Sequence, residues 1–235
     1  MKSKKAKTNY TIPKERSKKV ITALLVIVVF LNVLYLVLSS FTSTIYDESI
    51  YFKMQEKSGV YENLNETFAK EETAKVIDFL SGKNPELESN FLNENEISHF
   101  RDVKNLVKKG FIFYYIELFI LFLMFVFYYE YSQKGFAHCV SRVMIFSGIA
   151  AVLLVALLFF LNFSSLFNSF HVAFFEGNYS FPEGANILKL FPENFFSGFF
   201  RIIISLTLFK AVILILLGLT INSLDYFRRL FMMRR

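Results

Sequence analysis

The sequence predicts an all-α integral membrane protein with four transmembrane helices, both termini cytoplasmic, and a small helical extracytoplasmic cap. The chain of 235 residues is 54% hydrophobic and contains 31 phenylalanines, whereas a soluble domain is usually about 45–50% apolar. The excess is concentrated in four apolar runs of about 20 residues, the length that spans a bilayer as a helix. These runs are 20–38, 110–129, 143–161 and 199–221.

The composition also excludes several classes of protein. Four apolar runs of this length exclude a soluble enzyme and a nucleic-acid-binding domain. The single cysteine, Cys139, excludes an internal disulfide framework and a cysteine-rich metal centre. Membrane lipid is an expected partner, no nucleic-acid partner is expected, and the basic segment 1–19 is expected to contact anionic lipid.

The distribution of charge predicts the orientation in the membrane. Segment 1–19 has eight basic residues against one acidic residue, and the segments 130–142 and 222–235 are also net positive. The longer connecting segments 39–109 and 162–198 are net negative. Because positive segments stay in the cytoplasm, both termini are expected inside and both long segments outside. The first span is too long for a signal-peptide core and no A-x-A site follows it, so it is expected to be a retained anchor.

The two extracytoplasmic segments differ in their patterns. In 39–109, apolar spacing predicts a helix over about 65–80, which the SGKNP stretch at 81–85 ends. A second helix is predicted over 94–107, continuing into the second span.

Segment 162–198 is unusually rich in phenylalanine for an exposed loop. The phenylalanines at positions 163, 167, 170 and 174 have helical spacing. We therefore expect this part to form a helix at the outer membrane interface.

Two histidines are candidate catalytic residues, because both fall in the predicted outer segments. Glu96 lies three positions before His99 and Asp102 lies three positions after it, so a helix would place both carboxylates beside the imidazole. A carboxylate that orients an imidazole is half of a catalytic triad, although an ordinary charged helix face has the same spacing. His171 lies among phenylalanines, where a simple interfacial anchor is the alternative. The third, His138, is expected to be an ordinary residue of the short cytoplasmic loop.

Three ionisable residues fall within the apolar runs. Glu117 lies in the second span, and Arg201 and Lys210 lie in the fourth. Charged groups in a bilayer are costly and usually pair or serve a function. An interhelical ion pair of Glu117 with Arg201 or Lys210 is expected, with a structural role favoured over a catalytic one.

The blocks around both outer histidines resemble the bacterial lipoprotein intramolecular transacylase family (Lit). The resembling blocks are 96–104 (EISHFRDVK), 170–182 (FHVAFFEGNYSFP) and 190–196 (LFPENFF), and the predicted topology agrees over almost the whole chain. Tyr179 stands where the family pattern leads us to expect tryptophan, so no catalytic role is assigned to it.

This resemblance implies an acyl transfer at the outer leaflet of a bacterial cell membrane. The sn-2 acyl chain of a diacylglyceryl lipoprotein would move to the α-amino group of its N-terminal cysteine, giving a lyso-form lipoprotein. The amine would be the nucleophile, so the protein needs a base and oxyanion donors rather than a serine or cysteine. No cofactor and no metal are expected, and the chain is expected to work as a monomer.

The expected catalytic residues are His99 and His171. We favour His99, oriented by Asp102, as the base, with His171 stabilising the oxyanion or protonating the leaving alkoxide. Supporting donors are expected from Arg101, Lys104 and Asn178.

Two alternatives remain open from the residues alone. Two histidines and a carboxylate have the donor types of a metal-dependent membrane hydrolase. The second alternative is a non-catalytic membrane assembly factor or sensor whose cap binds a partner.

Overall fold

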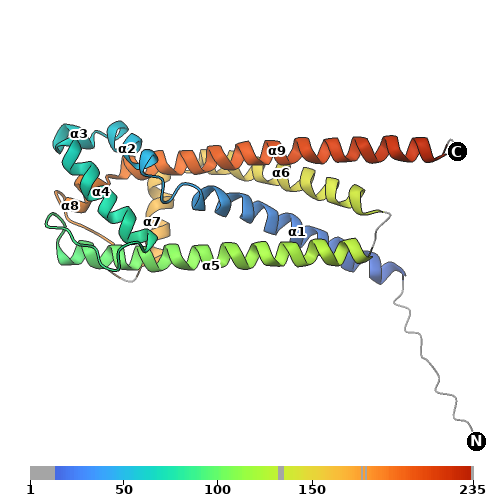
Figure 1. The fold of residues 1–235 in the computed structure, drawn as a ribbon, viewed down its shortest axis with the longest axis horizontal. Coiled ribbons are helices and arrows are strands. Elements are labelled where there is room, and N and C mark those ends of the chain that lie inside the picture. Colours follow the sequence, from blue (N-terminus) through green and yellow to red (C-terminus); the bar gives the residue numbers. More distant parts are fainter. Residues whose placement is uncertain (1–13, 132–134, 176, 178, 234–235) are drawn as a thin grey trace, which may run out of the picture.

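The computed structural model describes residues 14–131, 135–175, 177 and 179–233. Four long helices form an elongated bundle, and the shorter helices gather at one end of it (Figure 1). The long helices are α1 (Lys14–Thr42), α5 (Glu94–Tyr131), α6 (Phe136–Phe160) and α9 (Glu193–Met233). Each contains a segment long and apolar enough to span a membrane. The four predicted spans are therefore present as helices, and most extend beyond the predicted boundaries.

The bundle places the start of α1 and the end of α9 at the same end (Figure 1). This arrangement agrees with the predicted topology, in which both termini lie on the same side of the membrane. Segment 1–13 of the predicted basic arm lies outside the described residues.

The closest packing in the bundle is between α6 and α9. A Cβ atom on Gly148 would lie 2.4 Å from Cγ1 of Ile215 and 2.8 Å from the carbonyl oxygen of Ala211. A Cβ atom on Gly218 would lie 2.8 Å from Cγ1 of Ile145. Glycine at these two positions therefore lets the backbones approach, as small residues do between helices in lipid.

At the other end, a cap is built mainly from α2 (Glu48–Lys57), α3 (Val60–Asn63), α4 (Glu66–Ser81) and α8 (Asn186–Leu190). The helix predicted over 65–80 is α4, and its first and last residues follow local signals. The Asn65 side chain accepts a hydrogen bond from the Phe68 backbone N–H, and Gly82 ends the helix with a φ of 82°.

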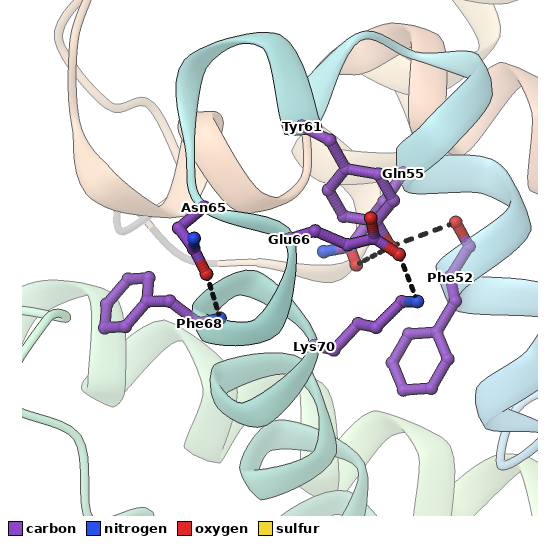
Figure 2. A network of polar contacts seen from close by, with 7 residues as sticks. All are labelled: Phe52, Gln55, Tyr61, Asn65, Glu66, Phe68 and Lys70. Atoms are coloured by element: carbon purple, nitrogen blue, oxygen red, sulfur yellow. Dashed lines mark hydrogen bonds and ion pairs between the residues drawn. The ribbon is translucent and has the colours of Figure 1, made fainter.

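Figure 2 shows the corner of the cap where these helices meet. The Tyr61 hydroxyl donates to the backbone carbonyl of Phe52, and Lys70 pairs with Glu66. Gln55 lies beside them, fully buried, and its amide donates to Thr73 and to the backbone carbonyl of Leu190. Gln55 therefore connects α2 to both α4 and α8.

The remaining helix, α7 (Phe163–Phe174), crosses the cap end of the bundle (Figure 1). It is the helix predicted from the phenylalanine spacing. The Asn162 side chain accepts from the Ser165 backbone N–H, and Ser164 bonds to Glu193 at the start of α9. None of its residues is buried, and Phe170 and Phe174 are exposed. An exposed apolar face at this level suits a membrane interface.

Candidate active site

His99 lies in the second turn of α5, and the start of this helix is held by a reciprocal cap. The Asn93 side chain accepts from the Glu96 backbone N–H, and Glu96 accepts from the Asn93 backbone N–H. The other carboxylate oxygen of Glu96 accepts from the Ile187 backbone N–H at 2.9 Å. Glu96 is fully buried, so one carboxylate fixes α5 against α8 about one turn before His99.

His171 lies in the last turn of α7 and has a main-chain partner. Its Nδ1 is 2.7 Å from the carbonyl oxygen of Phe167, one turn earlier in the same helix. A carbonyl oxygen only accepts hydrogen bonds, so Nδ1 donates. In the neutral ring, the lone pair is then on Nε2.

The fold brings the two histidines together, although they come from different segments of the chain. Their ring centroids are 6.3 Å apart and the ring planes differ by 17°. Phe175 contacts both rings, with centroid distances of 4.9 Å to His99 and 5.4 Å to His171. The chain turns at Gly177, whose φ is 81°, and returns Phe181 to within 5.4 Å of the His99 ring.

Both imidazoles line an apolar cavity of about 480 Å³. His99 is buried and His171 is half-buried. The lining is dominated by phenylalanines from α7, α9 and the connection between α7 and α8, and Leu158, Phe163, Phe200 and Ile203 extend it along the bundle. The cavity therefore joins a pair of proton-transfer groups to a surface suited to hydrocarbon.

Three predicted supporting residues do not join this site. Asp102 is exposed on α5. Arg101 pairs with Glu94 in the solvent-exposed first turns of α5. Lys104 donates to the carbonyl of Asn84 and lies 3.9 Å from the centroid of the Phe79 ring. Its contacts therefore connect α5 to α4 and the loop after it. Asn178 lies outside the described residues.

The expected ion pair within the spans is not formed in the described part of the chain. Glu117 is buried, and neither carboxylate oxygen has a hydrogen-bond partner there. Lys210 donates to the Ser39 hydroxyl at 3.0 Å instead. Arg201 is exposed. Helical register explains this difference, because residues that a hydropathy pattern places in neighbouring spans can face different helices.

Sequence reasoning noticed Glu96 only as a neighbour of His99 and missed its contact with α8. It also missed Phe175 and Phe181 as the rings that enclose the imidazoles. The FF and FP pairs of the 170–182 block were the available signal. Among the described residues, no group of three His, Cys, Asp or Glu side chains could hold a metal ion.

The fold and the site together define a polytopic helical membrane protein with paired imidazoles in an apolar cavity. The family model of the lipoprotein intramolecular transacylase Lit matches residues 24–196, a range that contains both histidines. The chain belongs to this family, and it is a membrane acyltransferase of lipoproteins. The metal-dependent hydrolase and the non-catalytic sensor are not favoured by this membership.

Solved structures have the same fold. The membrane-integral lipoprotein intramolecular transacylase Lit from Bacillus cereus matches with a TM-score of 0.70 and 20% identity, over 88% of this chain and 97% of that one. A variant of it with one histidine replaced by arginine matches with a TM-score of 0.69 at 20% identity, over 90% and 96%. A histidine-to-alanine variant matches with a TM-score of 0.71 at 18% identity, over 92% and 100%. No curated protein sequence matches the chain.

Proposed function

We propose that the chain transfers the sn-2 acyl group of a diacylglyceryl lipoprotein to the α-amino group of its N-terminal cysteine, at the outer leaflet. The observation that carries this proposal is the pair of imidazoles 6.3 Å apart in an apolar cavity. The outer leaflet follows from the charge distribution, because the cap and α7 belong to the segments without excess positive charge. The chain works as a monomer in this proposal.

The reaction is an ester aminolysis. The amine nitrogen attacks the ester carbonyl and loses a proton, and an oxyanion forms on the carbonyl oxygen. As this intermediate collapses, the C–O bond to the glyceryl group breaks, and the glyceryl oxygen takes up a proton that replaces the one removed from the amine, so no net proton is gained or lost. The products are an amide and a free hydroxyl on the same molecule. Because both reacting groups belong to one modified cysteine, binding in a folded conformation supplies much of the rate.

We assign the base role to His171. Its Nδ1–H is committed to the Phe167 carbonyl, which leaves Nε2 with the lone pair that accepts the amine proton. His99 then donates to the oxyanion or to the leaving glyceryl oxygen. These roles are the reverse of those favoured from the sequence, because the Phe167 carbonyl orients the His171 ring, whereas Asp102 is exposed.

The substrate's hydrocarbon is bound by the rings that line the cavity. An acyl chain in contact with Phe167, Phe196 and Phe200 removes apolar surface from water and from the polar headgroup region. The cavity lining continues along α7 and α9 toward the membrane spans. A substrate whose acyl chains stay in the bilayer can therefore reach the imidazoles.

The test uses the full chain reconstituted with a synthetic diacylglyceryl lipopeptide. Because the transfer is intramolecular, substrate and product have the same mass, and tandem mass spectrometry must locate the acyl group on nitrogen or on glycerol. His171→Ala and His99→Ala are each expected to lower the rate at least about 100-fold. The matched control is His138→Ala, an exposed histidine on α6 outside the cavity, which keeps the rate. Near-normal rates in both single variants would refute the site.

Glutamine substitutions separate the two roles. A glutamine amide can donate a hydrogen bond but cannot take up a proton at neutral pH. We therefore expect His99→Gln to retain more activity than His171→Gln. The opposite order would return the base role to His99 while leaving the overall reaction intact.

A further inference from the structure

A second cavity, of about 540 Å³, lies between α1, α5 and α9. It is separate from the histidine cavity, although the two are neighbours. Phe41 and Val107 line the histidine cavity. Thr42, the next residue of α1, and Phe111, about one turn after Val107 on α5, line this one. The proposed acyl transfer leaves this second cavity without a function.

The cavity contains an ammonium group without a counter-charge in the described part of the chain. Lys210 donates to the Ser39 hydroxyl at 3.0 Å, while Ser39 donates its own proton to the Leu36 carbonyl. An ammonium group has three N–H donors, and one is accounted for. The buried carboxylate of Glu117 makes no ion pair with Lys210. Charged groups in a membrane span usually pair with another group, and the two remaining N–H donors of Lys210 suit an anionic acceptor.

The rest of the lining favours an amphipathic anion over a free one. Tyr35 and Tyr114 stack with ring centroids 5.5 Å apart, and Tyr115 packs against Tyr114. Leu36 and Phe111 add apolar surface. Tyr115 is 62% exposed, on the side of the bundle that faces lipid. Phenol groups donate hydrogen bonds while their rings contact hydrocarbon, which suits the region where a headgroup meets its acyl chains.

The depth of the cavity is also that of a headgroup. Ser39 lies three residues before Thr42, the last residue of the first span, which is about 5 Å along a helix. The exposed Lys108 lies one turn before Phe111 on α5, toward the cap. Lys210 therefore reaches the edge of the hydrocarbon layer rather than its centre.

We propose that this cavity binds the phosphate of an anionic phospholipid, with the Lys210 ammonium on a phosphate oxygen. The phenol groups then bind the glycerol region, and the acyl chains run along the outside of α1 and α5. The lipid would connect three of the four spanning helices beside the histidine cavity. This proposal does not depend on the acyl-transfer chemistry.

The experiment measures lipid binding to the full chain, purified in detergent and freed of lipid. Phosphatidylglycerol is titrated and the bound fraction is read by native mass spectrometry. Lys210→Met is expected to weaken binding about tenfold, the effect of losing a charge-assisted hydrogen bond, and Lys210→Arg is expected to restore it. The matched control is Lys109→Met, which removes an exposed lysine on the same end of α5 and leaves binding unchanged. His171→Ala is also expected to bind normally.

Two further ligands test whether the cavity recognises a whole phospholipid or a free phosphate ion. Diacylglycerol, which lacks the phosphate, is expected to bind independently of Lys210, and inorganic phosphate is expected not to compete at millimolar concentration. An equal loss of phosphatidylglycerol binding in Lys210→Met and Lys109→Met would overturn the site, because the loss would then reflect the positive charge of the surface in general. Competition by inorganic phosphate at the same concentration as the lipid would show a free-anion site and overturn the lipid assignment.

Discussion

The cap and the spanning bundle are stabilised in different ways. The cap contains a continuous buried core that includes Val60, Ile77 and Leu190 and reaches Phe195 at the start of α9. In the bundle, the buried hydrophobic cluster consists of Leu36, Ala151 and Ala211, and many larger side chains are exposed. The cap therefore excludes water from apolar groups, whereas lipid tails surround most apolar groups of the bundle.

This difference explains where each region places its polar and small residues. The cap buries Gln55 and Glu96 only where each has hydrogen-bond partners on other elements. The bundle gains little from burying leucine, because lipid is as apolar as a leucine side chain. It relies instead on the close approach of α6 and α9 at Gly148 and Gly218.

The sharpest test of this comparison removes the same side chain from each region. Leu190 is 0% exposed in the cap, and Leu153 is 65% exposed on α6. Leu190→Ala is expected to lower the free energy of unfolding by about 3 kcal/mol, through lost burial and a cavity. Leu153→Ala is expected to change it by less than about 0.5 kcal/mol. Denaturant titration in detergent, followed by circular dichroism, measures both, and equal losses would contradict the comparison.

The next effect concerns the buried carboxylate of the cap. Glu96→Ala leaves the backbone N–H groups of Asn93 and Ile187 without their acceptor. The expected loss is about 2–3 kcal/mol, together with reduced acyl transfer, because α8 and the His99 turn lose their connection. Glu94→Ala, two residues earlier, removes an exposed partner of Arg101 and is expected to cost less than about 0.5 kcal/mol. If the two variants unfold alike, Glu96 does not hold the two helices together.

A smaller effect is expected from the glycine contact of the bundle. Gly148→Ala would place its Cβ against Ile215 and the Ala211 carbonyl, at a cost of about 2 kcal/mol. The control is Gly110→Ala on α5, whose Cβ would lie 4.0 Å from Phe41; alanine's higher helix propensity then leaves stability unchanged or improved. Thermal unfolding in the same detergent compares them. A stable Gly148→Ala variant would show that α6 and α9 have room to separate.

Local patterns predicted most of the helices and singled out the two histidines that the fold brings together. The Asn65 cap and Gly82 stop appear in the sequence at the ends of α4, and the phenylalanine spacing marked α7. The supporting residues were less predictable, because helical neighbours in sequence can face different surroundings. Asp102 and Glu96 are both three residues from His99, yet Asp102 is exposed and Glu96 is buried against α8.

The sequence alone therefore determined the four spans, the helical cap and its separation from the spans, because hydropathy, charge and capping residues act within a few turns. Only the tertiary structure decided which side chains meet. It stacked His99 of α5 on His171 of α7, turned Lys210 toward Ser39 instead of Glu117, and gave His171 its carbonyl partner. These contacts depend on how separate helices are rotated and offset against one another, and no pattern within one helix encodes that.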